Sequence, residues 1–191
     1  MKLEDAIKKR QSIRKYADKK PDWRKIIRCI DAARHAPSAG NHFITRFILI
    51  SDKDKINKIA TACSQDFVGD VEYIVAVVSD DATLTKHYGK KLGERYARQQ
   101  AGAAIQNFLL QITAEDLVTC WIGFYEESHI KKNLGIPEQK NIVVEALFPI
   151  GKETKVKTPQ KQKTDLETIT FFDKWNNKKM VPEKRTSVKA I

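Results

Sequence analysis

One segment restricts the possible folds of this chain more than any other. Residues 73–78 read Tyr-Ile-Val-Ala-Val-Val, a continuous apolar run rich in β-branched side chains. A strand with one face in water alternates apolar and polar residues, whereas a strand without this alternation is covered on both faces. The run therefore predicts a central strand in a sheet that carries helices on each side.

Apolar residues at helical spacing predict the helices that would cover this sheet. We expect helices over residues 3–10, 56–63, 97–112 and 126–134, and a further helix that begins after an N-cap at Asp22 and stops before Pro37. Additional strands are expected over residues 47–50, 117–123 and 142–148, the last closed by Pro149 and Gly151. The longest helical pattern contains Ala-Gly-Ala-Ala at residues 101–104, which would allow close approach of another helix, including that of a second copy.

The composition is that of an ordinary globular protein. A chain of 191 residues with 41% hydrophobic and 31% charged residues can build one good core. No apolar run approaches the roughly 20 residues that span a bilayer, and residues 1–5 lack the hydrophobic stretch of a signal peptide, so we expect a cytoplasmic protein without a membrane partner. The three cysteines form no C-x-x-C pair, which predicts buried free thiols.

The charge is strongly positive. An excess of 35 Lys and Arg over 24 Asp and Glu gives +11, which attracts phosphates, nucleotides or nucleic acid without choosing among them. Basic residues concentrate at residues 176–189, and we expect one domain over residues 1–175 and a basic tail over 176–191. Large apolar residues return over residues 166–175 and need a surface to cover, which is either their own chain or a partner subunit.

The first cluster that could carry chemistry is Arg10-Gln11-Ser12-Ile13-Arg14. In an extended segment alternate side chains share a face, so Arg10, Ser12 and Arg14 would point one way and Gln11 and Ile13 the other. Two guanidinium groups beside a hydroxyl suit a phosphate. The alternative is an exposed basic strand without a ligand.

Two further segments combine small residues with hydrogen-bonding groups. In the loop at residues 37–41, Ser38 and Asn41 supply polar groups while Ala39 and Gly40 leave room for a flat ligand, although an ordinary turn has the same composition. The run Thr-Cys-Trp-Ile-Gly at residues 119–123 ends in a glycine that would let backbone N–H groups approach a ring edge. Core packing is the alternative there.

Taken together, these segments resemble the nitroreductase family of FMN-dependent enzymes in order and spacing. The resemblance covers the R-x-S-x-R run at residues 10–14, A-P-S-A-G-N at 36–41, Gln106-Asn107 with Leu109-Leu110, C-W-I-G at 120–123, and L-G-I-P at 134–137 leading to A-L-F-P-I-G at 146–151. It implies an α+β fold with a central mixed or antiparallel sheet flanked by helices, and a C-terminal segment that wraps onto the partner subunit of a homodimer.

The resemblance also implies the cofactor and its ligands. The residues expected to bind FMN are Arg10, Ser12, Arg14, Pro37, Ser38, Ala39, Asn41, Ile122, Gly123, Lys161 and Lys163. Arg10, Ser12 and the lysine pair would hold the phosphate end, and Arg14 would lie near the pyrimidine edge and stabilise negative charge on the reduced ring. The loop at residues 37–41 would reach the flavin of the other subunit, and the backbone amides of Ile122 and Gly123 would approach N5 and O4.

The implied reaction passes hydride from NAD(P)H to flavin N5 and then electrons to a small acceptor in a ping-pong cycle. The protein then positions and tunes the cofactor, and no side chain acts as a catalytic acid, base or nucleophile. Nitroaromatics, quinones, enones and free flavins all fit such a site as acceptors, and the preference for NADH or NADPH is not encoded visibly. The sequence departs from the family at Phe43, where a glutamine is common, and at residues 115–118.

Two other functions stay open. The chain could bind flavin without general NAD(P)H turnover, or it could be a basic nucleic-acid-binding domain, although it has no recognisable motif for that and we do not expect nucleic acid as a partner. The four histidines, His35, His42, His87 and His129, form no metal-binding pair and are expected in loops or on the surface, with no metal site. The sequence contains no G-x-S-x-G elbow, P-loop or G-x-G-x-x-G fingerprint.

Overall fold

The computed structural model describes residues 1–138, 141–154 and 163–180. The chain divides into two compact units, residues 1–158 and residues 159–191, and each is described by itself. The sequence-based boundary between a domain ending at residue 175 and a basic tail remains a prediction, and residues 181–191 of that tail lie outside the described residues.

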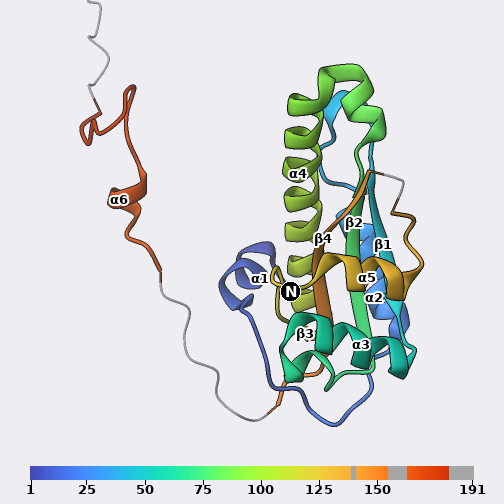
Figure 1. Ribbon diagram of the computed structural model, residues 1–191. Coiled ribbons are helices and arrows are strands. Elements are labelled where there is room, and N and C mark those ends of the chain that lie inside the picture. Colours follow the sequence, from blue (N-terminus) through green and yellow to red (C-terminus); the bar gives the residue numbers. More distant parts are fainter. Residues whose placement is uncertain (139–140, 155–162, 181–191) are drawn as a thin grey trace, which may run out of the picture. The chain divides into compact units, whose positions relative to one another are not determined.

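The first unit is built on a four-stranded antiparallel sheet with the strand order β1-β2-β4-β3 (Figure 1). The strands are β1 (Thr45–Ile50), β2 (Tyr73–Asp80), β3 (Val118–Thr119) and β4 (Ile142–Gly151). β2 lies inside the sheet, and all its residues except Asp80 are buried. The prediction of a central strand covered on both faces is therefore confirmed, and so is the α+β class.

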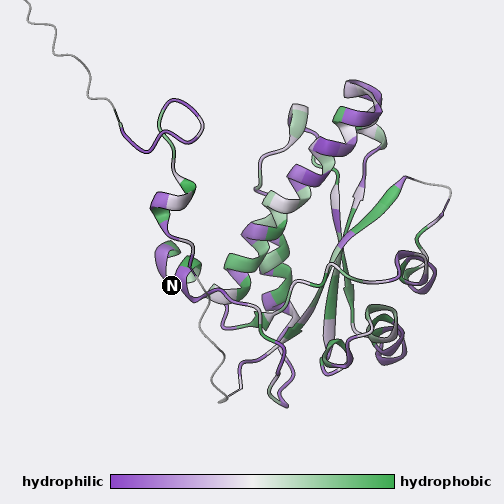
Figure 2. Cartoon of the chain, turned by 60° about the vertical axis from the view of Figure 1, so that its left-hand side comes forward, coloured by the Kyte–Doolittle hydropathy of each residue, from purple (hydrophilic) through white to green (hydrophobic). Residues whose placement is uncertain are grey.

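Helices cover both faces of the sheet, as expected. They are α1 (Leu3–Lys9), α2 (Trp23–Ala33), α3 (Lys53–Cys63), α4 (Ala82–Ala114) and α5 (Glu127–Leu134). The side chain of Asp22 accepts a hydrogen bond from the amide of Arg24, which confirms Asp22 as the N-cap of α2. Apolar side chains line the strands and the inner sides of the helices, while the outer sides are mostly hydrophilic (Figure 2).

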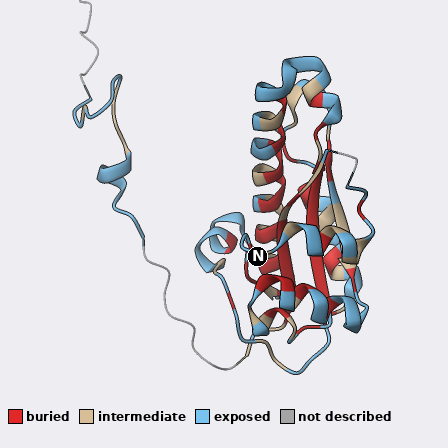
Figure 3. Cartoon of the chain, viewed as in Figure 1, coloured by how far each residue is buried: buried red, intermediate tan, exposed pale blue. Residues whose placement is uncertain are grey.

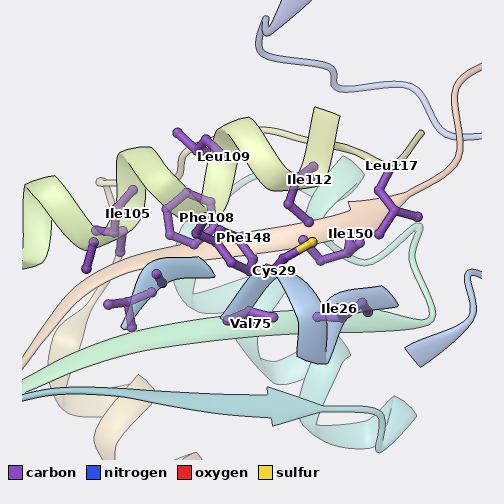
Figure 4. Close-up of a cluster of buried hydrophobic side chains, with 14 of the residues drawn as sticks. Ile26, Cys29, Val75, Ile105, Phe108, Leu109, Ile112, Leu117, Phe148 and Ile150 are labelled. Carbon is purple, nitrogen blue, oxygen red and sulfur yellow. The ribbon is translucent and has the colours of Figure 1, made fainter. Parts of the chain in front are cut away.

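The alternation of side chains along β2 divides the core into two parts. Tyr73, Val75 and Val77 face α2 and α4, and they pack with Ile26, Cys29, Ile105, Phe108, Phe148 and Ile150 (Figure 4). Ile74, Ala76 and Val78 face the opposite way and pack with Ile56, Ile59, Cys63, Ile130 and Leu147 of α3, α5 and β4.

The cysteines are buried free thiols, as predicted. Burial raises the pKa of Cys29 to about 12 and that of Cys63 to about 11, so both stay protonated at neutral pH.

Two strand predictions need correction. The strand expected over residues 117–123 is paired as β3 only at Val118–Thr119, and its continuation is a single bridge between Ile122 and Leu147. β4 does not close before Pro149 but runs on to Gly151. Pro149 pairs with Ile74 of β2, but its nitrogen faces the other way, toward Cys120, where the pairing is interrupted between the Leu147–Ile122 and Gly151–Val118 pairs because proline has no N–H to donate.

A β-bulge at Glu145 interrupts the alternation along β4. Val77 pairs with Ala146 and Val78 with Val144, so Glu145 is the extra residue. Its carboxylate accepts a hydrogen bond of 2.5 Å from Arg98 Nη1 on α4. Burial raises the pKa of Glu145, and the charge of Arg98 opposes that rise. The bulge thus places a carboxylate against the central helix.

α4 is longer than its apolar stripe predicts and is broken near its start. Gly89 has φ 75° and ψ 161°, a backbone conformation that favours glycine. The short helical piece before Gly89 packs back onto the rest of α4 at Gly93, where a Cβ atom would lie 2.5 Å from the backbone of Thr85. We call residues 82–93 the α4 tip, most of which is exposed (Figure 3).

Glu115 joins α2 to the end of α4. Arg28 donates to both of its carboxylate oxygens, from Nε at 2.8 Å and from Nη2 at 2.9 Å. The ammonium group of Lys25 lies 3.5 Å from the same carboxylate. The hydrogen bond from Arg28 is the main cause that lowers the pKa of Glu115 to about 2.

We therefore expect Glu115→Gln to lower the free energy of unfolding at pH 7 by about 1–2 kcal/mol. The folded-state pKa lies below the ordinary value of 4.5, so this contribution is fully present above pH 4.5 and is lost as the pH falls toward 2. Urea unfolding at several pH values should show the two proteins converging below pH 4.5. Glu4→Gln, which removes an exposed ion pair with Lys8, is the control with little effect. A difference for Glu115→Gln that is independent of pH would contradict this account.

The second unit, where described, consists of α6 (Leu166–Ile169) and a loop that follows it. The side chain of Asp165 caps α6 by accepting a hydrogen bond from the amide of Glu167. Lys178 donates to carbonyl oxygens of Thr168 and Thr170 and lies over the ring of Phe171. Several large apolar side chains remain more than 60% exposed: Leu166, Ile169, Trp175 and Met180.

Candidate functional site

The segment at residues 10–14 is extended and lies beside β3. The amide of Ile13 donates a 2.9 Å hydrogen bond to the carbonyl of Thr119, and Ser12 forms a parallel bridge with Thr119. Ile13 is buried, Ser12 and Arg14 are exposed, and Arg10 is half-buried. Ser12 and Arg14 therefore share the exposed face, as predicted, whereas Arg10 lines a small cavity together with Gln11 and Ile13, which were predicted to point the other way.

The polar groups on that face are available to a ligand. Among the described residues, neither Arg10 nor Arg14 has an ion pair or a side-chain hydrogen bond, and the hydroxyl of Ser12 has no partner. Arg10 also lines a small cavity with Thr119, whose hydroxyl oxygen is buried without a hydrogen-bond partner. Unpaired guanidinium groups and a hydroxyl are donors of the kind that bind the phosphate end of a nucleotide.

β3, which lies beside this segment, continues in the chain into residues 120–123. Trp121 rests edge-on against Phe148, with 5.6 Å between the ring centroids. Ile122 is buried, and its amide donates a 3.0 Å hydrogen bond to the carbonyl of Leu147. The amide of Gly123 has no such partner among the residues that the structure describes, and Gly123 is exposed. Of the two amides predicted to approach a flavin ring, only that of Gly123 is therefore free.

The loop at residues 37–41 contains a short 3₁₀ turn, η1 (Ala39–Asn41). Gly40 and Asn41 both have positive φ, of 56° and 60°. A Cβ atom on Gly40 would lie 2.6 Å from the hydroxyl oxygen of Tyr88. Pro37 and Asn41 are exposed, and Ser38 is half-buried. The loop thus presents small and polar groups to solvent while it packs against the α4 tip.

The structure brings two of the three segments together and keeps the third apart. Arg10 lines a cavity beside Leu109 of α4, whereas Ala39 packs against a cluster that contains Ala97. Twelve residues of α-helix separate these two positions, which is about 18 Å. Within one chain, residues 10–14 and 120–123 therefore lie toward one end of α4 and the loop at 37–41 toward the other (Figure 1).

The remaining predicted ligands fall outside this comparison. Lys161 lies outside the described residues, and Lys163 is an exposed residue of the second unit. Phe43, where the sequence departs from the family pattern, is partly buried and packs against the core under α2 and α4. All four histidines are exposed, as predicted.

One group near the loop was not predicted from the sequence. His42 and His87 stack with ring centroids 5.0 Å apart, and Tyr88 packs edge-on against Tyr96 at 5.2 Å. These rings come from the loop and from the two sides of the break at Gly89. The expected helix began at residue 97, so the sequence did not indicate the helical piece before Gly89 that brings His87 and Tyr88 to the loop.

Comparisons with known proteins identify the family. The model of the nitroreductase family matches residues 7–68 and 59–152. A protein of Archaeoglobus fulgidus, named as a candidate NADH dehydrogenase/NAD(P)H nitroreductase, is 31% identical over 147 residues, covering 74% of this chain and 80% of that protein. The chain belongs to the nitroreductase family.

Solved structures agree with this assignment. A nitroreductase family protein from Clostridium novyi NT is 29% identical, with a TM-score of 0.73 over 93% of this chain and 96% of that one. Iodotyrosine deiodinase bound to FMN and 3-iodo-L-tyrosine shares the fold, with a TM-score of 0.74 at 19% identity over 86% of this chain and 96% of that one. Within the described ranges, no helix combines the length and apolar character needed to cross a membrane.

Proposed function

We propose that this protein is an FMN-dependent oxidoreductase that takes reducing equivalents from NAD(P)H and passes them to a small acceptor by a ping-pong mechanism. The observation that carries the proposal is the pair of unpaired guanidinium groups at Arg10 and Arg14, which lie beside the strand that leads to the free amide of Gly123. Bound FMN would supply the redox chemistry, by accepting hydride at N5 and giving up electrons to the second substrate.

The residues of this chain have distinct tasks in that cycle. Arg10 and Ser12 would hold the phosphate, together with Lys161 and Lys163 of the C-terminal region. Gly123 would donate its amide to the edge of the ring, and Arg14 would place a fixed positive charge near the pyrimidine, where negative charge develops on reduction. The name of the Archaeoglobus fulgidus relative and the FMN in the iodotyrosine deiodinase structure support this choice of donor and cofactor.

We further propose that the protein acts as a homodimer in which each flavin lies between the two subunits. Arg10 and Ala39 lie beside α4 residues that are about 18 Å apart along the helix, which supports a site completed by the other subunit. Ser38, Ala39, Asn41 and Pro37 would then serve the flavin held by Arg10 of the partner subunit. Gly102, on the outer side of α4, has open space around it for a second helix. The exposed side chains of Leu166, Ile169 and Trp175 suit a segment that covers a partner.

The first test is spectroscopic. Purified protein supplied with FMN should turn yellow and should bleach when NADH or NADPH is added without oxygen. Subsequent addition of a quinone or nitroaromatic acceptor should restore the colour. Yellow protein that does not bleach with either donor would favour flavin binding without NAD(P)H turnover, and protein that takes up no FMN would contradict the proposed cofactor.

The second test asks whether each site needs both subunits. Arg10→Ala should weaken FMN binding about tenfold or more, because it removes a charge-assisted contact to phosphate. Ser38→Ala/Asn41→Gly should also weaken binding, and glycine keeps the positive φ at position 41 without strain. A heterodimer isolated with two different affinity tags, one chain carrying each variant, should regain one site of wild-type affinity. Two equally weak sites would show that each site is built from one chain.

The third test concerns the charge of Arg14. Arg14→Ala should make bound FMN harder to reduce, and the midpoint potential measured with a redox dye should become more negative. Arg14→Lys, which keeps the charge, should recover most of the potential. An unchanged potential in Arg14→Ala would remove Arg14 from this role even if FMN still binds.

A further inference from the structure

The α4 tip is attached to the loop that the proposed function places at the flavin. The hydroxyl oxygen of Tyr88 packs against Gly40, and the rings of His87 and His42 stack. Beneath them Leu84 is fully buried and packs with Ile44 and Ala97, so the tip is anchored to the body of the first unit. In the proposed dimer, the tip therefore borders the open face of the flavin to which this loop contributes.

Positive charge exceeds negative charge on the tip and on the helical turn that follows it. Residues 82–98 contain five Lys and Arg residues and a single carboxylate, Glu94. Arg98 forms an ion pair with Glu145, whose side chain is 9% exposed. In the part of the chain that the structure describes, Lys86, Lys90 and Lys91 have no ion pair and no side-chain hydrogen bond. Unpaired cations at the border of a site attract an anionic ligand.

The same tip carries aromatic rings that pack against the loop. Tyr88 is 37% exposed and stands edge-on to Tyr96. His87 Nδ1 lies 2.8 Å from the carbonyl oxygen of Thr83, to which it donates, and within the described ranges Nε2 has no hydrogen-bond partner.

We propose, resting on the proposed function, that the α4 tip selects electron acceptors that are flat and carry an anionic group such as a carboxylate or sulfonate. The 2′-phosphate of NADPH is separated from its nicotinamide by two riboses and a pyrophosphate. Lys90 and Lys91, in contrast, follow Tyr88 by only two and three residues. This short separation matches a small acceptor better than the far end of a dinucleotide.

The test compares two acceptors of the same shape, 4-nitrobenzoate and neutral 4-nitrobenzamide, with the FMN-loaded dimer. The ratio of their kcat/KM values should favour the anion, and it should fall about threefold to tenfold in Lys90→Gln/Lys91→Gln, since each exposed charge pair contributes modestly. Raising the salt concentration should lower the wild-type ratio in the same direction. Lys58→Gln/Lys132→Gln, which removes the same charge from exposed positions on α3 and α5, should leave the ratio unchanged.

Each other outcome has a definite meaning. If FMN-loaded protein reduces both acceptors but the ratio is the same in the wild type and in Lys90→Gln/Lys91→Gln, the inference is wrong while the proposed function stands. If that variant instead changes the ratio of kcat/KM for NADPH and NADH and leaves the acceptor ratio alone, the tip selects the donor and the inference is again wrong. Protein that binds no FMN, or that is not reduced by NAD(P)H, overturns the proposed function and this inference together.

Discussion

The burial of β2 on both faces is the constraint on which the rest of the structure depends. A strand of this kind requires a helical layer on each face. The face that carries Val75 packs against α2 and α4, and the face that carries Ala76 packs against α3 and α5. The polar residues of the candidate site are then confined to the margins of this core. The segment at residues 10–14 lies beside β3 at the edge of the sheet. The loop at residues 37–41 lies between the end of α2 and the start of β1.

Much of this arrangement follows from local sequence, and the exceptions have physical causes. The cap at Asp22, the helices and the buried strand depend on spacing that a single segment reveals. The course of β4 through Pro149 depends on which neighbouring strand its nitrogen faces, and this is a property of the sheet. For the same reason, the sequence could not show that the amide of Ile122 is already bonded to Leu147.

The site was predictable as three segments but not as an arrangement. Alternation placed Ser12 and Arg14 on the exposed face, and Ser12 lies beside Thr119, but alternation did not show that Arg10 lines the same cavity as Gln11 and Ile13. The histidine and tyrosine rings near Gly40 were hidden, because His87 and Tyr88 come next to this loop only through the break at Gly89 and the tight contact at Gly93. At Phe43, where the sequence departs from the family pattern, the structure packs the side chain against the core.

The length of α4 between Ala97 and Leu109 has a thermodynamic consequence in the proposed dimer. A cofactor that needs groups from opposite ends of this helix would bind the dimer and not the separate chains. Cofactor binding would therefore stabilise the dimer, and dimer formation would strengthen cofactor binding by the same free energy. Dilution would then release the flavin, and added flavin would hold the subunits together at concentrations where the empty chains separate. Retention of the cofactor becomes a function of how much of the protein a cell maintains.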